Sequence, residues 1–372
     1  MHSPTPSSPG SATGQPIEAV CLAEHMDAVV VGAGPAGCAF AVGFASGGGC
    51  VTLVDGSGQG SKPCGGAFPP AQLSETVSGA LAATKPLWSV PSRVQFETAD
   101  GQSESWPVPQ GALVVCARQR LDEALRNCAA EAGARLVRGR ATNIHRADGR
   151  WRLQVGRTAL SAGLLVGADG AAGSHGVREA LGLPPTRGLW ARISHVDASG
   201  SGLPLRVRAL PVPGYCWCFP GTEATSLGYL VVNPIDFEQP EVRSSFARFA
   251  ADAAPGAPME AEWSGRIPYL DRPGAAAPAC GPDWALVGDA AGLCDPITGA
   301  GIAAALRSGA LAAATARTGR LGATDALWWT GEVGESLARS ISAFGAAMRL
   351  GGEAGRAAYH ALLRQAFGGH PR

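Results

Sequence analysis

The most constraining feature of this sequence is a glycine fingerprint between two apolar runs. Residues 28–31 lead into Gly32-Ala33-Gly34-Pro35-Ala36-Gly37, and a second apolar run at 51–54 ends at Asp55. In a strand–turn–helix unit, the first glycine permits the tight turn, the second lets the backbone approach a pyrophosphate, and the third allows close packing of helix on strand. Asp55 lies 21 residues after Gly34, where an acid can accept hydrogen bonds from a ribose. The segment predicts a dinucleotide-binding unit.

Two further segments predict strands that end in an acid at a turn. Residues 164–170 (LLVGADG) run to Asp169, and residues 284–292 (WALVGDAAG) carry Gly288 and Asp289. The second segment continues through Pro296 to Gly299-Ala300-Gly301-Ile302, where an Ala-rich helix is expected to begin. An acid at such a strand end can accept hydrogen bonds from flavin ribitol, and the N–H groups of a helix start can stabilise the reduced ring. In this order, the three segments predict FAD.

Residues 213–220 (PGYCWCFP) predict a strand with an aromatic face. Because strand side chains alternate, Tyr215, Trp217 and Phe219 should share one face, and Cys216 and Cys218 the other. Such an aromatic face forms a broad apolar wall that suits a hydrocarbon chain or a planar ring. The alternative is an ordinary core strand of an antiparallel sheet. With the flavin segments present, we expect the three aromatic residues to bind the substrate.

These motifs resemble FAD-dependent oxidoreductases of the p-hydroxybenzoate hydroxylase type, and within them the geranylgeranyl reductase family, over roughly residues 26–320. Residues 115–122 (VCARQRLD) place Arg118 where an arginine of that family approaches FAD. Residues 62–66 (KPCGG) are similar to a segment beside the isoalloxazine, and 213–220 is similar to one that borders the substrate cavity. The resemblance implies that Lys62, Cys64, Gly65 and Arg118 bind the cofactor.

The same resemblance implies that the chain reduces carbon–carbon double bonds by hydride transfer from flavin N5, on an isoprenoid-like or other apolar substrate. Tyr215, Trp217 and Cys64 are the candidate catalytic residues, with Tyr215 or an ordered water as the proton donor. The alternative is an FAD-dependent monooxygenase for an aromatic or polyketide-like molecule. A flavin-dependent halogenase is less favoured, because it needs a lysine near the substrate and the chain has only Lys62 and Lys85. Ala67 and Ala300 depart from the family pattern, and the stretch between Gly170 and Val177 is about two residues longer than in that pattern. Ala300 and this longer loop leave the substrate and the reductant open.

No second glycine fingerprint follows the first. This absence decides little, because the resemblance implies that nicotinamide reductants can bind transiently without one. NAD(P)H, or another electron donor that could be a protein, is the expected reductant. The charges balance at 30 basic and 30 acidic residues, which argues against nucleic acid as a partner. Contact with a membrane surface stays open, because no basic amphipathic helix indicates it.

Ten cysteines contain no CxxC pair, and the first 25 residues lack the pattern of a secretory signal. These features favour a cytoplasmic protein. The Cys-x-Cys of the aromatic strand has no nearby histidine pair, so we expect no metal site.

The order of these elements predicts an α/β fold, with a Rossmann-like FAD-binding domain, an interleaved antiparallel-sheet substrate domain and C-terminal helices. We expect a disordered leader at 1–25. The cofactor domain would comprise 26–66, 113–185 and 270–320, the substrate domain 67–112 and 186–269, and a helical cap 321–372. Periodicity places helices at 121–132 and 240–253 within these limits.

Overall fold

The protein is described from a computed structural model that defines residues 27–57, 62, 64–70, 88–171, 176–196, 202–256, 263–274 and 279–368. The leader predicted at 1–25 lies outside these residues.

A five-stranded parallel sheet forms one end of the molecule. Four of its five strands are short, largely apolar runs, as expected where both faces of a parallel sheet are covered, and the edge strand at 135–138 is mostly exposed. The central strand β1 is buried over Ala28 to Val31. The order β18-β12-β1-β2-β8 joins Trp284–Leu286, Leu164–Gly167, Asp27–Val31, Cys50–Asp55 and Arg135–Arg138.

Different elements cover the two faces of this sheet. Ala28 and Val30 of β1 pack in the cluster formed with α1 (Pro35–Ala45), α3 (Arg118–Glu131) and α6 (Ile302–Arg317). Val29 and Val31 face the opposite way, toward a small antiparallel sheet. The strands of this small sheet are β9 (Ala141–Ala147), β10 (Arg150–Val155) and β11 (Thr158–Ala162).

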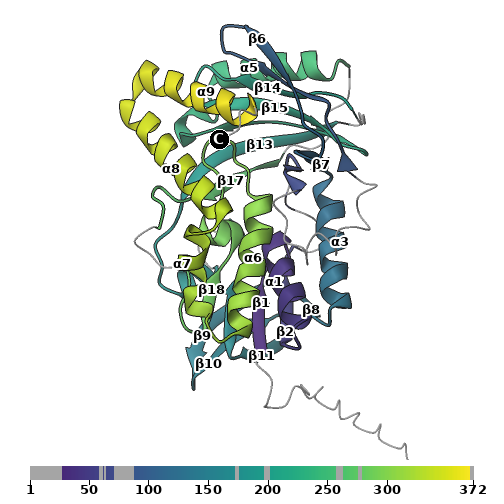
Figure 1. Cartoon of the computed structure of the whole chain (residues 1–372), viewed down its shortest axis with the longest axis vertical. Helices are drawn as coiled ribbons and strands as arrows, with labels where there is room; N and C mark the ends of the chain where they lie inside the picture. Colours follow the sequence, from purple (N-terminus) through teal and green to yellow (C-terminus); the bar gives the residue numbers. More distant parts are fainter. Residues whose placement is uncertain are drawn as a thin grey trace, which may run out of the picture.

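A seven-stranded sheet forms the other end (Figure 1). All its neighbouring strands are antiparallel except β14 beside β5. Two of its strands precede residue 113 in the chain and five follow residue 186, so the chain passes between the two sheets several times. The order β17-β13-β16-β15-β14-β5-β6 joins Trp263–Tyr269, Arg187–Val196, Thr225–Val231, Gly214–Pro220, Leu205–Ala209, Arg93–Glu97 and Ser103–Pro107.

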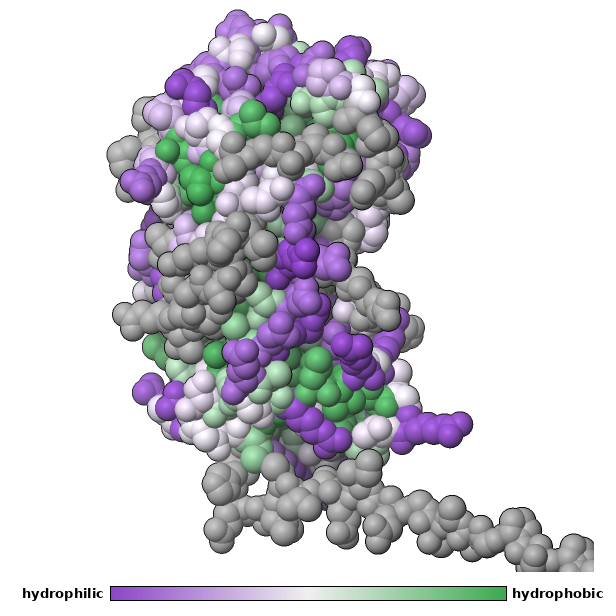
Figure 2. Space-filling view, turned by 90° about the vertical axis from the view of Figure 1, so that its right-hand side faces the viewer, coloured by the Kyte–Doolittle hydropathy of each residue, from purple (hydrophilic) through white to green (hydrophobic). Residues whose placement is uncertain are grey.

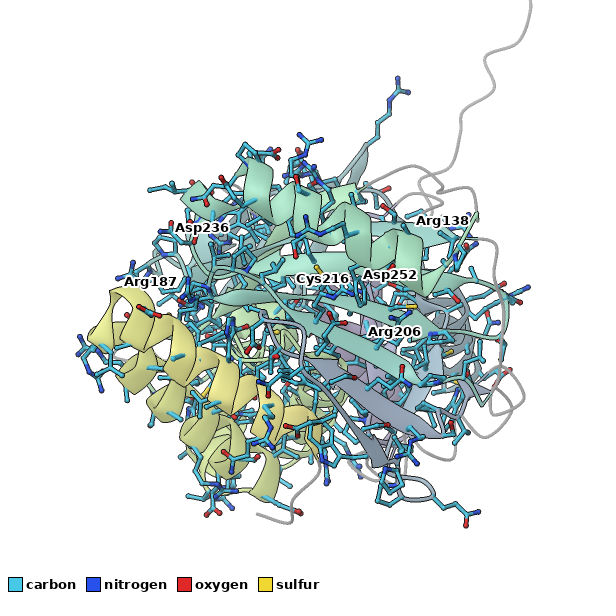
Figure 3. The ribbon with its side chains drawn as sticks, turned by 90° about the horizontal axis from the view of Figure 1, so that it is seen from above. Arg138, Arg187, Arg206, Cys216, Asp236 and Asp252 are labelled. Atoms are coloured by element: carbon cyan, nitrogen blue, oxygen red, sulfur yellow. The ribbon has the colours of Figure 1, made fainter. Side chains whose placement is uncertain are left out.

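Helix α5 (Pro240–Ala253) covers the outer face of the seven-stranded sheet, and Figure 3 shows it from above with Cys216 and Arg206 beneath it. Arg206 Nη1 donates to the Asp252 carbonyl at 2.8 Å, and Arg208 Nη2 pairs with the Asp252 carboxylate at 2.9 Å. The inner face of the sheet points toward the parallel-sheet end of the molecule.

The C-terminal helices run along one side of the molecule from the parallel sheet to the seven-stranded sheet (Figure 1). They are α7 (Thr324–Trp329), α8 (Glu332–Leu350) and α9 (Gly352–Gly368), and α9 packs against β5. A three-stranded sheet lies at the junction, in the order β3 (Ala67–Phe68), β7 (Val114–Cys116), β4 (Trp88–Ser89). Short helical turns complete the described elements: α4 (Val177–Ala180), η3 (Pro234–Asp236), η4 (Gly288–Ala291) and η5 (Leu321–Ala323).

This architecture confirms the predicted α/β fold. The helices expected at 240–253 and from Ile302 are α5 and α6, whereas α3 begins at Arg118, earlier than the predicted 121. The residue limits of the two domains stay predictions, and β3 and β4 pair with β7 across the limit placed at 113.

Among the described helices, none has both the length and the apolar character needed to cross a bilayer. On the face shown in Figure 2, hydrophilic and apolar side chains are interspersed.

Candidate active site

One large cavity, of about 750 Å³, lies between the parallel-sheet end and the inner face of the seven-stranded sheet. It brings together nearly all the residues predicted to form the site. Gly37, Gly288 and Pro296 do not line it. The predicted residues that do are Gly32, Gly34, Pro35, Ala36, Asp55, Lys62, Cys64, Gly65, Arg118, Asp169, Tyr215, Trp217, Phe219, Asp289, Gly299, Gly301 and Ile302.

The glycine turn leaves backbone exposed to this cavity. Gly32 has φ +113°, and a Cβ on it would lie 2.2 Å from the Ala168 carbonyl oxygen. A Cβ on Gly37 would lie 1.9 Å from the Gly32 oxygen, so α1 approaches β1 too closely for any side chain. Helix α1 begins after Gly34 without a side-chain cap, and α6 begins in the same way after Gly301. Both helix starts therefore direct N–H groups toward the region where a dinucleotide would be held.

Asp55 ends β2 at the cavity and is 5% exposed. One carboxylate oxygen accepts from the Ser57 N–H at 3.0 Å, and the other lies 4.0 Å from Arg126 Nε. Burial of a carboxylate with these partners leaves it anchored at the strand end. This position fits the predicted hydrogen bond to a ribose.

Lys62 and Asp289 form an ion pair at 2.6 Å across the cavity wall. Burial alone would lower the pKa of Lys62, but the charge of Asp289 and the hydrogen bond to it raise that pKa above the ordinary value. Both residues were expected at the cofactor, yet the sequence does not show that they pair. The pair keeps the lysine charged at the place where a flavin ribitol is expected.

Arg118 projects into the cavity from the first turn of α3. Its Nε donates to Asp122 Oδ1 at 2.7 Å, one helical turn later. Burial would lower the pKa of Arg118, but the nearby Asp122 carboxylate raises it above the ordinary value. A Cβ on Gly34 would lie 3.6 Å from Arg118 Nη2, so the guanidinium lies beside the glycine turn, where it can contact an anionic group.

Asp169 lies just beyond the end of β12 and lines the cavity. Its Oδ2 accepts from the N–H of Val177, the first residue of α4, at 2.8 Å. Burial raises the pKa of Asp169. One oxygen of this predicted cofactor residue is thus used to hold the turn closed.

Strand β15 is buried along its whole length, and its two faces differ as predicted. Tyr215, Trp217 and Phe219 pack in the inner cluster, with ring centroids 5.9 and 6.2 Å apart in succession. Cys216 and Cys218 pack in the outer cluster, under α5. The aromatic wall therefore faces the cavity.

Gly65 joins this wall to the segment that is predicted to lie beside the cofactor. A Cβ on Gly65 would lie 2.8 Å from Phe219 Cδ2 and 3.5 Å from Trp217 Nε1. Cys64 also lines the cavity, where its sulfur accepts from the Gly66 N–H at 3.4 Å. The two segments that carry the narrower family resemblance thus contact each other in space.

The Tyr215 hydroxyl donates to the Thr298 carbonyl. Burial raises the pKa of Tyr215, and nearby Cys294 and Asp295 add to the effect. The phenol therefore holds its proton firmly, and that proton already has an acceptor. This geometry weakens the case for Tyr215 as the proton donor.

Several lining residues were not predicted. Ala366 and Phe367 of α9 line the cavity, where Phe367 packs edge-on against Tyr215 with ring centroids 5.7 Å apart. Cys294 also lines the cavity, and no motif indicated it. Within the described part of the chain, no cluster of three or more histidine, cysteine or acidic residues could hold a metal ion.

A parallel sheet whose glycine turn opens into this cavity, with an antiparallel sheet as the opposite wall, is the arrangement of the p-hydroxybenzoate hydroxylase type of FAD-binding fold. No protein-family model matches the chain. Among curated proteins, it is similar to a menaquinone reductase of Mycobacterium tuberculosis (strain H37Rv), at 30% identity over 78% of this chain and 76% of the relative. A menaquinone reductase of Mycolicibacterium smegmatis is 29% identical over 85% and 82%.

A geranylgeranyl diphosphate reductase of Rhodobacter capsulatus is 34% identical over 39% of this chain and 37% of the relative. The chain belongs to the geranylgeranyl reductase family of FAD-dependent oxidoreductases, and it is an enzyme.

Solved structures show the same fold. A geranylgeranyl bacteriochlorophyll reductase-like protein from Thermoplasma acidophilum aligns with TM-score 0.69 at 20% identity, covering 86% of this chain and 83% of that one. A flavoprotein/dehydrogenase from Cytophaga hutchinsonii aligns with TM-score 0.68 at 19% identity, covering 93% and 89%. A flavin-dependent halogenase aligns with TM-score 0.65 at 18% identity, covering 87% and 65%.

Proposed function

We propose that this enzyme uses FAD to reduce a carbon–carbon double bond in the isoprenoid part of an apolar substrate. The observation that carries the proposal is the continuity of the cavity. Glycine backbone and charged side chains line one half of the cavity, which we call the cofactor half. This half is continuous with the other half, whose wall is formed by Tyr215, Trp217 and Phe219. A cofactor in the first half and a hydrocarbon in the second would be in contact.

The distribution of charge in the cavity supports an apolar substrate. The charged lining residues of the described chain all belong to the cofactor half, and they are Asp55, Lys62, Arg118, Asp122, Arg126, Arg140, Asp169 and Asp289. The seven-stranded sheet contributes only apolar and aromatic residues, namely Val94, Ala191, Ile193, Leu205, Tyr215, Trp217, Phe219, Leu230, Trp263 and Ile267. Menaquinone and geranylgeranyl diphosphate, named for the relatives, both carry a polyprenyl chain. Such a chain matches the uncharged wall.

When bound, FAD would supply hydride transfer from N5 to one carbon of the double bond. The Gly32–Gly34 turn and the starts of α1 and α6 would hold its phosphates and ring, with Asp55 and Asp289 on its hydroxyl groups. The rings of Trp217 and Phe219 would fix the orientation of the substrate chain, because they line the cavity beside Gly65. The apolar sheet would keep bulk solvent from the reacting carbons.

The second carbon must receive a proton. The Tyr215 hydroxyl already donates its proton to the Thr298 carbonyl, so we assign the proton to an ordered water molecule rather than to Tyr215. Tyr215→Phe is then expected to keep alkene reduction within about tenfold of the wild-type rate, since general acid catalysis by the phenol would be worth about a hundredfold or more. Single-turnover reoxidation of the flavin measures this rate, and a hundredfold loss would restore Tyr215 as the donor.

For the reductant, we propose NAD(P)H or another donor that binds transiently, as the family resemblance implies. Stopped-flow reduction of the bound flavin by NADH, NADPH and a reduced ferredoxin would compare the candidates directly.

An anaerobic reoxidation assay tests the function. The bound flavin is reduced chemically, a geranylgeranyl compound is added, and the return of the oxidised flavin band is followed. This substrate is preferred to menaquinone for the first test, because a quinone can oxidise the flavin without any change in its side chain. The fully saturated analogue is the matched control. Reoxidation by the unsaturated compound alone, with a product that has gained two hydrogen atoms, is the expected result.

A flavin that stays reduced with the alkene, and reoxidises quickly in oxygen with hydroxylation of an aromatic substrate, would favour a monooxygenase.

The fold is shared with halogenases as well. Of the two lysines, Lys62 lines the cavity but is paired with Asp289, and Lys85 lies outside the described residues. The pairing of Lys62 argues against the role that a halogenase needs from it.

A further inference from the structure

The segment 295–301, between η4 and α6, forms part of the cofactor wall. Thr298, Gly299, Ala300 and Gly301 line the cavity, and α6 begins directly after them. The segment is braced internally by Asp295, whose Oδ1 accepts from the N–H groups of Ile297 and Thr298 at 2.8 and 3.0 Å. These bonds set its local shape, but they do not attach it to the rest of the molecule.

Two tyrosines from other parts of the fold make that attachment. Tyr215 of β15 donates to the Thr298 carbonyl, and Tyr359 of α9 donates to the neighbouring Ile297 carbonyl at 2.8 Å. Tyr359 has no exposed surface, and burial raises the pKa of its hydroxyl well above the ordinary value. The hydroxyl therefore keeps its proton and remains a donor throughout the physiological pH range.

Tyr359 is also held on its other sides. Its ring packs edge-on against Phe344 of α8, with centroids 6.2 Å apart. On α9 itself, Arg356 Nη1 donates to the Pro211 carbonyl at 2.9 Å, and Arg364 Nη2 pairs with Glu104 of β6 at 2.7 Å. Helix α9 is thus fastened to the seven-stranded sheet while Tyr359 reaches the cofactor segment. A buried tyrosine hydroxyl needs an acceptor, and the acceptor of Tyr359 lies in the segment that forms the cofactor wall.

We propose that Tyr359 is a positioning residue for FAD. It holds segment 295–301, and with it the N-terminal end of α6, at a fixed place from the C-terminal helix. The inference requires only that FAD occupies the cavity, and it does not depend on which substrate is reduced.

Tyr359→Phe tests the proposal, because it removes one hydroxyl and keeps the ring. Tyr229→Phe is the matched control, since Tyr229 is equally buried. Its hydroxyl donates to the Phe237 carbonyl at 3.0 Å on the outer face of the seven-stranded sheet, away from the cavity. Apoprotein is titrated with FAD, and the midpoint potential of the bound flavin is measured. We expect FAD affinity to fall about fivefold in Tyr359→Phe, the loss typical of one hydrogen bond, and to stay unchanged in Tyr229→Phe.

The midpoint potential should become more negative in Tyr359→Phe alone, because the positive end of α6 would stabilise the reduced ring less. Amide hydrogen exchange at 297–301, measured below the melting temperature of each variant, should be faster in Tyr359→Phe only. Wild-type affinity, potential and exchange in Tyr359→Phe, or equal losses in both variants, would overturn the proposal. Failure of the wild type to reduce alkenes, with the FAD difference intact, would overturn the proposed function and leave this inference standing.

Discussion

Among single residues, Gly32 and Gly34 are glycine for different physical reasons, although they belong to one fingerprint. At Gly32 a side chain would meet the Ala168 carbonyl at 2.2 Å, with φ in the left-handed region. We expect Gly32→Ala to lower the free energy of unfolding by about 3 kcal/mol. At Gly34 a Cβ meets only Arg118 Nη2, at 3.6 Å. Gly34→Ala should leave stability within about 0.5 kcal/mol but weaken FAD binding, because the methyl group enters the cavity.

Urea unfolding of the two apoproteins and titration with FAD measure these effects separately. Equal loss of stability in both variants would contradict the distinction, since it would mean that the cavity side of the turn is also closely packed.

The pair between Lys62 and Asp289 carries a prediction about pH. Lys62→Met removes the partner of a partly buried carboxylate and should cost about 2 kcal/mol of apoprotein stability. The pKa of Lys62 is raised above its ordinary value of 10.5, so the stabilisation is fully present below that pH. It is lost only as pH rises through the higher pKa of the folded state.

The difference in unfolding free energy between wild type and Lys62→Met should therefore be constant from about pH 7 to 9 and shrink above about pH 10.5. The double variant Lys62→Met with Asp289→Asn isolates the coupling between the two residues. A difference that already declines near neutral pH would show that the lysine is not held charged by Asp289.

These residues also mark how far the sequence could predict the site. Motifs placed Lys62 and Asp289 separately at the cofactor, because each belongs to a local pattern. Their pairing joins positions 227 apart in the chain, and no local pattern reports such a contact. The contact of Gly65 with Phe219 was missed for the same reason.

At the scale of elements, strand β15 was predicted better than helix α3. The alternation of its side chains is a property of the strand itself, so the aromatic and cysteine faces followed from the sequence. The start of α3 depends on the loop before it, and the helix begins at Arg118 rather than at 121. That earlier start is what puts Arg118 and Asp122 one turn apart on the same face.

Helix α9 was expected only as part of a cap, because periodicity identifies a buried face but not what that face covers. Its Phe367 packs against Tyr215 at the cavity, so it limits the space beyond the aromatic wall. We expect Phe367→Ala to raise kcat/KM for longer polyprenyl chains relative to shorter ones by about tenfold, the low end of the discrimination that a hydrophobic pocket gives for one methylene group.

Competition assays with chains of different length measure this ratio. Leu362→Ala is the control, since Leu362 lies on the same helix and packs against the same cluster without lining the cavity. The same change in chain-length preference in both variants would show that α9 acts through stability rather than through the shape of the cavity.

For the whole molecule, the interleaved chain predicts cooperative unfolding. The cavity is walled by both sheets, and α9 connects the seven-stranded sheet to segment 295–301. Calorimetry of the apoprotein should show one transition. FAD at about 100 times its Kd should raise the unfolding free energy by about 2.7 kcal/mol and shift that single transition. Two transitions, only one of which moves with FAD, would mean that the sheets fold independently.

The order of strands has a last consequence, for synthesis on the ribosome. Strands β5 and β6 emerge early, but β5 must wait for β14, more than a hundred residues later, before its second edge is paired. The seven-stranded sheet can be completed only after Tyr269 has emerged, and the parallel sheet only after Leu286. At roughly 5–20 residues per second, the nascent chain exposes unpaired strand edges for many seconds. Production of this protein should therefore depend strongly on chaperones and on temperature during translation, well before FAD can bind.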